Sequence, residues 1–282
     1  MKTNFLNSRS KVMTLKMIAI FFLILLLLVP KFMVEDLVSE RNRLNESVSH
    51  EVSSHWSGDQ LISGPYLVIP YWNQVYNESN KTYDKIESQV IVFPESLDIA
   101  GILSTTSKYR SLYNVLLYES NIKINGEFKM PDFKEINILK ESLIWDKAML
   151  RFPFSDSKGI NSEIKFNVDS TPLILNPGMG NFKCSATNNN QDDEYTHSLS
   201  RIFPNQNSFN TGLSCKFPIV EGTTNYHFNL EMSLKGSSSL LFSPIAKTTQ
   251  VKLSSTFKDP SFVGEFLPEH NLSNSGFEAN WK

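Results

Sequence analysis

The strongest hydrophobic pattern in the chain is a run of fourteen residues, Met17–Pro30, that contains no charged side chain. As a helix this run measures about 21 Å, which is shorter than the ~30 Å hydrocarbon core of a bilayer. Apolar residues on both flanks extend the run to Val12–Val34, about 34 Å, and Lys16 and Lys31 lie near its ends, where long side chains reach the headgroups. The pattern therefore predicts a transmembrane helix over residues 12–34.

A cleaved signal peptide and the core helix of a soluble protein are the alternatives to a membrane anchor. A signal peptidase site needs small residues after the apolar run, but residues 31–36 are bulky or charged. We therefore predict an uncleaved signal anchor. Four basic side chains and no acidic one precede the run (Lys2, Arg9, Lys11 and Lys16). The positive-inside rule then predicts that residues 1–11 are cytoplasmic and that the chain after Val34 lies outside the cytoplasm.

Apolar residues at three- and four-residue steps continue directly after the membrane segment. Leu37, Leu44 and Val48 belong to this stripe, and Glu and Arg residues lie between its members. Such spacing is typical of an amphipathic helix, and Trp56-Ser57-Gly58 is expected to end it. We expect a juxtamembrane helix over residues 35–56 that continues from the anchor without a break.

The period then changes to two, which is typical of strands with one buried and one solvated face, as in antiparallel sheets. Alternation is clearest at 122–130, 164–168, 226–234 and 251–257. Tyr66–Tyr71 and Val90–Phe93 are apolar on both faces and indicate central strands. Ser104–Leu117 fits a strand or a helix, and we favour a strand. Residues 57–282 are thus predicted to form a mainly β, antiparallel, sandwich-like extracytoplasmic domain.

Short segments rich in Gly, Pro, Asn and Ser separate these runs and predict turns. They are Asn125-Gly126, Ser157-Lys158-Gly159, Asn176-Pro177-Gly178, Glu221-Gly222 and Lys235-Gly236.

Residues 183–210 break the alternation. Residues 188–194 are all polar and show no period, so we predict a long exposed loop inserted into the β domain. Cys184 and Cys215 bracket most of this loop and lie on the side of the membrane predicted to be oxidising. A Cys184–Cys215 disulfide, which would contribute about 3–4 kcal/mol by constraining the unfolded chain, is the favoured interpretation. Two free buried thiols are the alternative.

Charge and motifs restrict the classes of function. The net charge is −2 and no basic patch stands out, so nucleic acid is not an expected partner. The sequence has no GxSxG, HExxH or P-loop motif and no CxxC pair, and we predict no catalytic residue, cofactor or metal site. His227 is expected to be a solvated residue on the polar face of a strand. His197 lies near Asp192, Asp193 and Glu194; these could bind a divalent cation, but a solvated acidic loop is the favoured interpretation.

Five collinear strings resemble segments of the CreD family of bacterial inner-membrane proteins. They are SGPYLVIP at 63–70, FPESL at 93–97, Tyr113–Gly126, SDSKGI at 155–160, and PSFVGEFLP at 260–268 followed by SGFEANW at 275–281. They are similar to the family patterns GP-x-(L/I)-x-IP, LPESL, Y-x-V-x-(V/L)-Y-x-(S/A), SD-x-(R/K)-GI, and PSF-x-G-(D/E)-FLP with SGF-x-A-x-W. The resemblance extends from the anchor to the last residue.

This resemblance implies a bacterial inner-membrane protein that is tied to cell-envelope integrity and induced through a two-component stress response. Together with the anchor and the alternating strands, we expect a periplasmic β domain with the lipid bilayer and other envelope proteins as partners. No established catalytic activity comes with the family, so no catalytic residue is carried over. The family continues into several C-terminal membrane helices whereas this chain stops at Lys282, and the domain is therefore expected to be incomplete at its C-terminal end.

Three functions follow from these observations. The leading hypothesis is a non-enzymatic envelope-integrity protein whose β domain meets other envelope components. The alternatives are a periplasmic ligand-sensing module that signals through a partner, and a membrane-anchored hydrolase that acts on cell wall or lipid.

Overall fold

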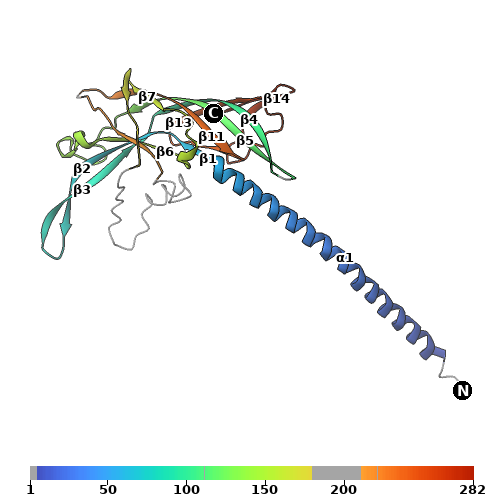
Figure 1. Cartoon of the computed structure of the whole chain (residues 1–282). Coiled ribbons are helices and arrows are strands. Elements are labelled where there is room, and N and C mark those ends of the chain that lie inside the picture. Colours follow the sequence, from blue (N-terminus) through green and yellow to red (C-terminus); the bar gives the residue numbers. More distant parts are fainter. Residues whose placement is uncertain (1–4, 111, 180–210, 221) are drawn as a thin grey trace. The chain divides into compact units, whose positions relative to one another are not determined.

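The computed structural model describes residues 5–110, 112–179, 211–220 and 222–282 (Figure 1). It divides into two compact units, Met1–Val52 and Ser53–Lys282. The first unit is helical, and the second is built mainly from strands.

A single helix, α1 (Phe5–Trp56), contains the anchor and the juxtamembrane segment and runs through Pro30 without a break. The large apolar side chains between Met13 and Val38 are exposed. Within the described ranges, α1 is the one helix that is long and apolar enough to cross a membrane. The predicted helix and its predicted end at Trp56 are confirmed.

Fifteen strands and three single-turn 3-10 helices make up the described part of the second unit. They are β1 (Gln60–Ser63), β2 (Tyr66–Asn77), β3 (Thr82–Val92), β4 (Ser96–Arg110), β5 (Tyr113–Lys129), η1 (Lys140–Ser142), η2 (Trp145–Lys147), β6 (Met149–Pro153), η3 (Ser157–Gly159), β7 (Lys165–Val168), β8 (Thr171–Leu173), β9 (Asn176–Pro177), β10 (Gly212–Lys216), β11 (Asn225–Ser237), β12 (Leu240–Ser243), β13 (Thr248–Ser255), β14 (Glu269–Ser273) and β15 (Gly276–Trp281). The predicted mainly β fold is confirmed.

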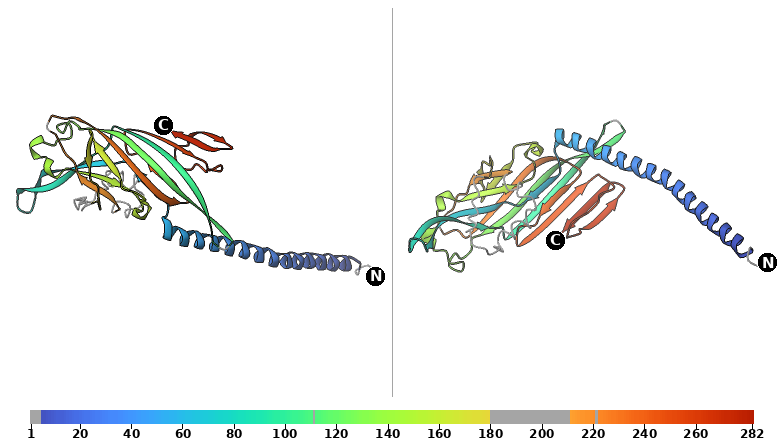
Figure 2. Two further views of the ribbon diagram at one scale, coloured as in Figure 1. Left: turned by 45° about the horizontal axis from the view of Figure 1, so that its top comes forward. Right: turned by 90° about the horizontal axis from the view of Figure 1, so that it is seen from below.

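The largest sheet has eight strands in the order β14-β15-β13-β4-β5-β11-β7-β8 (Figure 2). Its neighbours are antiparallel except β4 and β13, which pair in parallel from Ser96↔Thr248 to Leu103↔Ser255. A two-stranded sheet of β1 and β12 is also parallel. The predicted antiparallel β-rich arrangement thus contains two parallel pairs, which the alternation could not reveal because a half-buried parallel strand shows the same period of two.

A second large sheet has five strands in the order β3-β2-β6-β10-β9. Tyr66–Tyr71 opens β2, which lies between β3 and β6, so its prediction as a central strand is confirmed. Val90–Phe93 was the other expected central strand, and here the prediction is wrong, since β3 is an edge of this sheet. Its apolar character reflects packing of Val90, Ile91 and Phe93 against the core.

The inward-facing side chains of both large sheets form one apolar core. Phe128 of β5 is fully buried and packs against Phe217 and Phe228, with ring centroids 6.1 and 4.8 Å apart. Phe228 also contacts Phe166 of β7 at 6.1 Å. These aromatic contacts join strands that are distant in sequence, so the core is a property of the whole domain.

Two of the predicted turns lie inside strands. Asn125-Gly126 belongs to β5 and Lys235-Gly236 to β11, and both pairs are fully within the β5–β11 ladder. Ser104–Leu117, in contrast, is not one strand: it is divided between β4 and β5 and holds their hairpin. The Ser157-Lys158-Gly159 turn is confirmed as η3.

The predicted insertion at 183–210 lies outside the described residues, as do Cys184 and Glu221. Cys215 is in β10 and is 4% exposed. Burial raises the pKa of its thiol to about 11. The Cys184–Cys215 disulfide stays a prediction.

Candidate functional site

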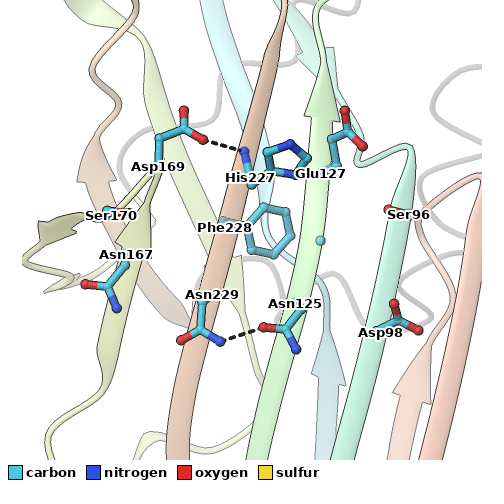
Figure 3. Close-up of a pocket in the computed structure, with 11 residues that line it drawn as sticks. Ser96, Asp98, Asn125, Glu127, Asn167, Asp169, Ser170, His227, Phe228 and Asn229 are labelled. Atoms are coloured by element: carbon cyan, nitrogen blue, oxygen red, sulfur yellow. Dashed lines mark hydrogen bonds between the residues drawn. The ribbon is translucent and has the colours of Figure 1, made fainter.

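The outward face of the eight-stranded sheet is polar, because each long strand places its apolar residues in the core and its polar residues on the other side. One cross-strand row consists of Asp98 of β4, Asn125 of β5, Asn229 of β11 and Asn167 of β7. Amide and carboxylate groups from four strands thus lie side by side although no local motif joins them (Figure 3).

An open hollow of about 810 Å³ occupies this face. It is lined by Ser96, Asp98, Asn125, Gly126, Glu127, Asn167, Asp169, Ser170, His227, Phe228 and Asn229. We call this set the polar hollow. Figure 3 shows its side chains on neighbouring strands, with a hydrogen bond from Asn229 Nδ2 to Asn125 Oδ1 that links β11 to β5.

One wall of the polar hollow is fixed by a tight turn after β7. Asp169 and Ser170 both have positive φ values, 45° and 70°, which is the geometry of a two-residue type I′ hairpin. The backbone N–H of His227 donates to Asp169 Oδ1 at 2.9 Å, and the N–H of Asp169 donates to the His227 carbonyl at 2.9 Å. The backbone of β11 therefore fixes the position of the Asp169 carboxylate.

The charge of the polar hollow is mainly negative, with Asp98, Glu127 and Asp169 against a single histidine, His227. Farther along the same two strands the charges are paired: Lys123 Nζ of β5 donates a hydrogen bond to Glu231 Oε1 of β11, at 2.8 Å. This hydrogen bond, with the charges of Lys123 and Lys165, lowers the pKa of the Glu231 carboxyl. Within the part of the chain that the structure describes, no group of three or more His, Cys, Asp or Glu residues could hold a metal ion.

These features define what the polar hollow can do. It offers hydrogen-bond acceptors and donors in fixed rows, carries negative charge, and is open to water. Such a surface suits recognition of polar or cationic groups.

A buried polar network fixes the chain to the domain where α1 ends. Ser57 Oγ donates to Asp156 Oδ2 at 2.9 Å, and Gln60 Nε2 donates to Ser57 Oγ at 2.6 Å. Ser237 Oγ, at the end of β11, donates to the Ser57 carbonyl at 2.9 Å and bonds Ser53 Oγ at 2.8 Å. We call these five residues the joint. Ser57 and Gln60 are fully buried and Ser237 is 1% exposed, so the centre of the joint is shielded from water, whereas Ser53 and Asp156 are half-buried.

The joint brings together two segments that are far apart in the sequence: Ser57 and Asp156 are 99 positions apart. Asp156 belongs to SDSKGI, and its Oδ1 also accepts from the N–H of Lys158, which caps η3. The next residue, Gly159, leaves no room for a side chain, since a Cβ there would lie 2.5 Å from Gln60 Nε2 and 2.5 Å from the Lys235 carbonyl oxygen. Buried hydrogen bonds of this kind stabilise one fixed geometry, because an unpaired partner would carry a desolvation cost.

The structure places the sequence candidates as follows. His227 is exposed on the polar face of β11, as the alternation predicts. His197, Asp192, Asp193 and Glu194 lie outside the described residues. The polar hollow was not predicted as a site, since its residues come from four strands and share only the alternating pattern.

Comparisons with known proteins agree with this picture of a membrane-anchored chain. A family model described as "Inner membrane protein CreD" matches residues 12–282. The curated relative of that name from Escherichia coli (strain K12) is 26% identical over 274 residues, which cover 95% of this chain and 54% of the relative. The chain therefore spans about half the length of the curated relative that it matches. No solved structure matches. The chain belongs to the CreD family of inner membrane proteins.

Proposed function

We propose that this chain is a cell-envelope integrity protein whose β domain binds other envelope components on the periplasmic side of the inner membrane, without catalysis. The observation that carries the proposal is the polar hollow: an open, mainly acidic sheet face whose side chains are held in cross-strand rows. The relative from Escherichia coli bears the name inner membrane protein CreD, which supports the same compartment.

The orientation is part of the proposal and is supported by the basic residues that precede the span. We expect residues 1–11 in the cytoplasm and the β domain in the periplasm. A new cysteine at Ser10 or at the exposed Glu78 tests this with a membrane-impermeant maleimide, in a Cys184→Ser background whose remaining Cys215 is buried. Cells with a permeabilised outer membrane should label the Glu78→Cys chain but not the Ser10→Cys chain. The reverse result would show the opposite topology.

The chemistry of the polar hollow points to a partner with cationic or hydrogen-bond-donating groups. Asp98, Glu127 and Asp169 supply acceptors within one hollow, and Asn125 and Asn167 add amides that both donate and accept. The joint supports this role, because its hydrogen bonds fix the segment that follows α1 to the β domain. A partner bound at the sheet would thereby be tethered to the anchor.

The direct test is a strain that lacks the gene. We expect increased sensitivity to detergents and to antibiotics that act on the envelope, and recovery when the full chain is supplied again. Unchanged growth under every envelope stress would show that the proposed role is wrong.

A ligand-sensing module is the second candidate, because the polar hollow is large enough for a small polar molecule. This function needs a signalling partner. Crosslinking in membranes, followed by mass spectrometry, should then recover a signalling protein with the wild-type chain and lose it when the acidic residues of the hollow are neutralised. Recovery of structural envelope proteins favours the first proposal.

A further inference from the structure

The hairpin of β4 and β5 extends beyond the strands that flank it. The last pair between β11 and β5 is Ser237↔Leu117, and the last between β13 and β4 is Ser255↔Leu103. β4 and β5 then continue alone as far as Arg110↔Tyr113. At about 3.3 Å per residue, Leu112 lies about 16 Å beyond Leu117. Figure 2 shows this green hairpin passing the end of the sheet.

The end of this hairpin combines bulky apolar side chains with positive charge. Tyr109 is 76% exposed and Leu112 is 88% exposed. Between Asp98 and Glu119, the charged residues are Lys108 and Arg110 alone, so twenty residues of chain carry two cations and no acid. Exposed aromatic and leucine side chains beside Lys and Arg are typical of surfaces that enter the interface of an anionic bilayer.

The other long hairpin has a different end. Between β2 and β3 the chain is polar from Asn77 to Thr82, and the end folds on itself through a bond from Asn77 Nδ2 to Asp84 Oδ2 at 2.7 Å. The adjacent Tyr76 and Tyr83 pack on each other with ring centroids 5.3 Å apart. Tyr76 and Tyr83 are 50% and 69% exposed, so both hairpins carry exposed aromatic side chains. The charges differ: acidic and basic residues alternate at the β2–β3 end (Glu78, Lys81, Asp84 and Lys85), whereas the β4–β5 end carries cations alone.

The hairpin starts to project near the point where the chain enters the β domain. Ser237, which pairs with Leu117, bonds Ser53 in the last turn of α1, so the chain enters the β domain at the level from which the hairpin starts to project. The segment from Val34 to Ser53, which links the predicted span to this level of the domain, is about 28 Å of helix.

We propose that the end of the β4–β5 hairpin binds the anionic phospholipid surface of the membrane that holds α1. Tyr109 and Leu112 enter the interfacial layer, and Lys108 and Arg110 pair with lipid phosphates. The domain then has a second, reversible attachment to the membrane in addition to its anchor. This attachment does not depend on what the polar hollow binds.

The test uses the full chain in bilayer nanodiscs, since α1 holds it there regardless of the hairpin. An environment-sensitive fluorophore is attached to Asn114→Cys, which leaves the four contact residues intact, in a Cys184→Ser background. A chain without the Asn114→Cys change controls for labelling of the buried Cys215. The same fluorophore on Glu78→Cys, at the polar end of the β2–β3 hairpin, is the matched control.

With phosphatidylglycerol in the disc, we expect blue-shifted emission from the Asn114→Cys probe and quenching by shallow nitroxide lipids. The pair Lys108→Gln and Arg110→Gln should lower the ratio of bound to unbound hairpin roughly 10- to 30-fold, and Leu112→Ser should also weaken contact. The Glu78→Cys probe should stay water-like throughout. Equal emission from both probes, or contact that is as strong in pure phosphatidylcholine, would overturn the proposal. Thermal unfolding of each variant confirms that the domain remains folded.

Discussion

Phe228 of β11 lies directly across from Gly126 of β5, and its ring occupies the space that a side chain at position 126 would need. A Cβ at that position would also lie 2.5 Å from the Ser96 carbonyl oxygen. Gly236 and Tyr118 are paired in the same way on the same two strands. In both cases a glycine accommodates a large aromatic ring across the ladder, which is why neither glycine forms a turn.

Gly126→Ala should therefore destabilise the β domain by about 1–3 kcal/mol, because the backbone at Ser96 cannot move away cheaply. Gly58→Ala is the control, since no atom lies within 4 Å of the added Cβ. Urea unfolding measures both. Equal midpoints for the two variants would contradict the packing described for Phe228.

These glycines also show which features of the fold can be predicted from the sequence. Alternation identifies most of the strands and the polar face, because that signal is local. The partner of Gly126 is more than a hundred residues away, so an Asn-Gly pair in isolation is indistinguishable from a hairpin turn. The parallel β4–β13 pairing and the edge position of β3 also depend on partners that are distant in the sequence, so local patterns do not predict them. The polar hollow follows from cross-strand register, and local periodicity does not determine register.

Tyr118 should make stability fall at alkaline pH. Burial first, and then the charge of Asp59, raises the pKa of its phenol. In the unfolded chain a tyrosine phenol has a pKa of about 10. The contribution of Tyr118 to the free energy of unfolding is therefore fully present below that pH, and it is lost as the pH rises toward the raised pKa of the folded state. Urea unfolding of the wild-type chain should show a decline in stability from about pH 10 upward.

Tyr118→Phe is the matching variant. It removes the hydrogen bond from Tyr118 Oη to the Ser239 carbonyl, 2.7 Å long, and should cost about 1 kcal/mol at neutral pH. Its stability should then fall less steeply above pH ~10. An identical alkaline slope in both chains would show that Tyr118 is not the responsible group.

Asp156 should hold the start of the β domain in place. Asp156→Ala leaves Ser57 Oγ and the N–H groups of Gly58 and Lys158 without their acceptor. We expect a loss of about 1–3 kcal/mol in unfolding free energy, with faster amide hydrogen exchange at residues 57–63. Lys158→Ala serves as the control, because it retains the Asp156 carboxylate. Unchanged exchange in Asp156→Ala would rule out the joint as a constraint.

The cysteine pair can be tested by mass spectrometry without reductant. If Cys184 and Cys215 are bonded, a linked peptide is recovered and reduction lowers stability by about 3–4 kcal/mol. If they are thiols, Cys215 should react slowly with iodoacetamide at pH ~8, because burial raises its pKa to about 11. Two thiols detected after denaturation without reductant would contradict the predicted disulfide.

The central claim is that the acidic polar hollow carries the envelope function, and complementation of the deletion strain tests it most directly. The triple variant Asp98→Asn, Glu127→Gln, Asp169→Asn removes the negative charge of the hollow with little change of shape. Glu78→Gln, Glu135→Gln, Glu141→Gln removes three exposed charges elsewhere. Both chains should accumulate equally in the membrane. We expect the control to restore detergent resistance and the hollow variant to fail; full restoration by the hollow variant would contradict the account.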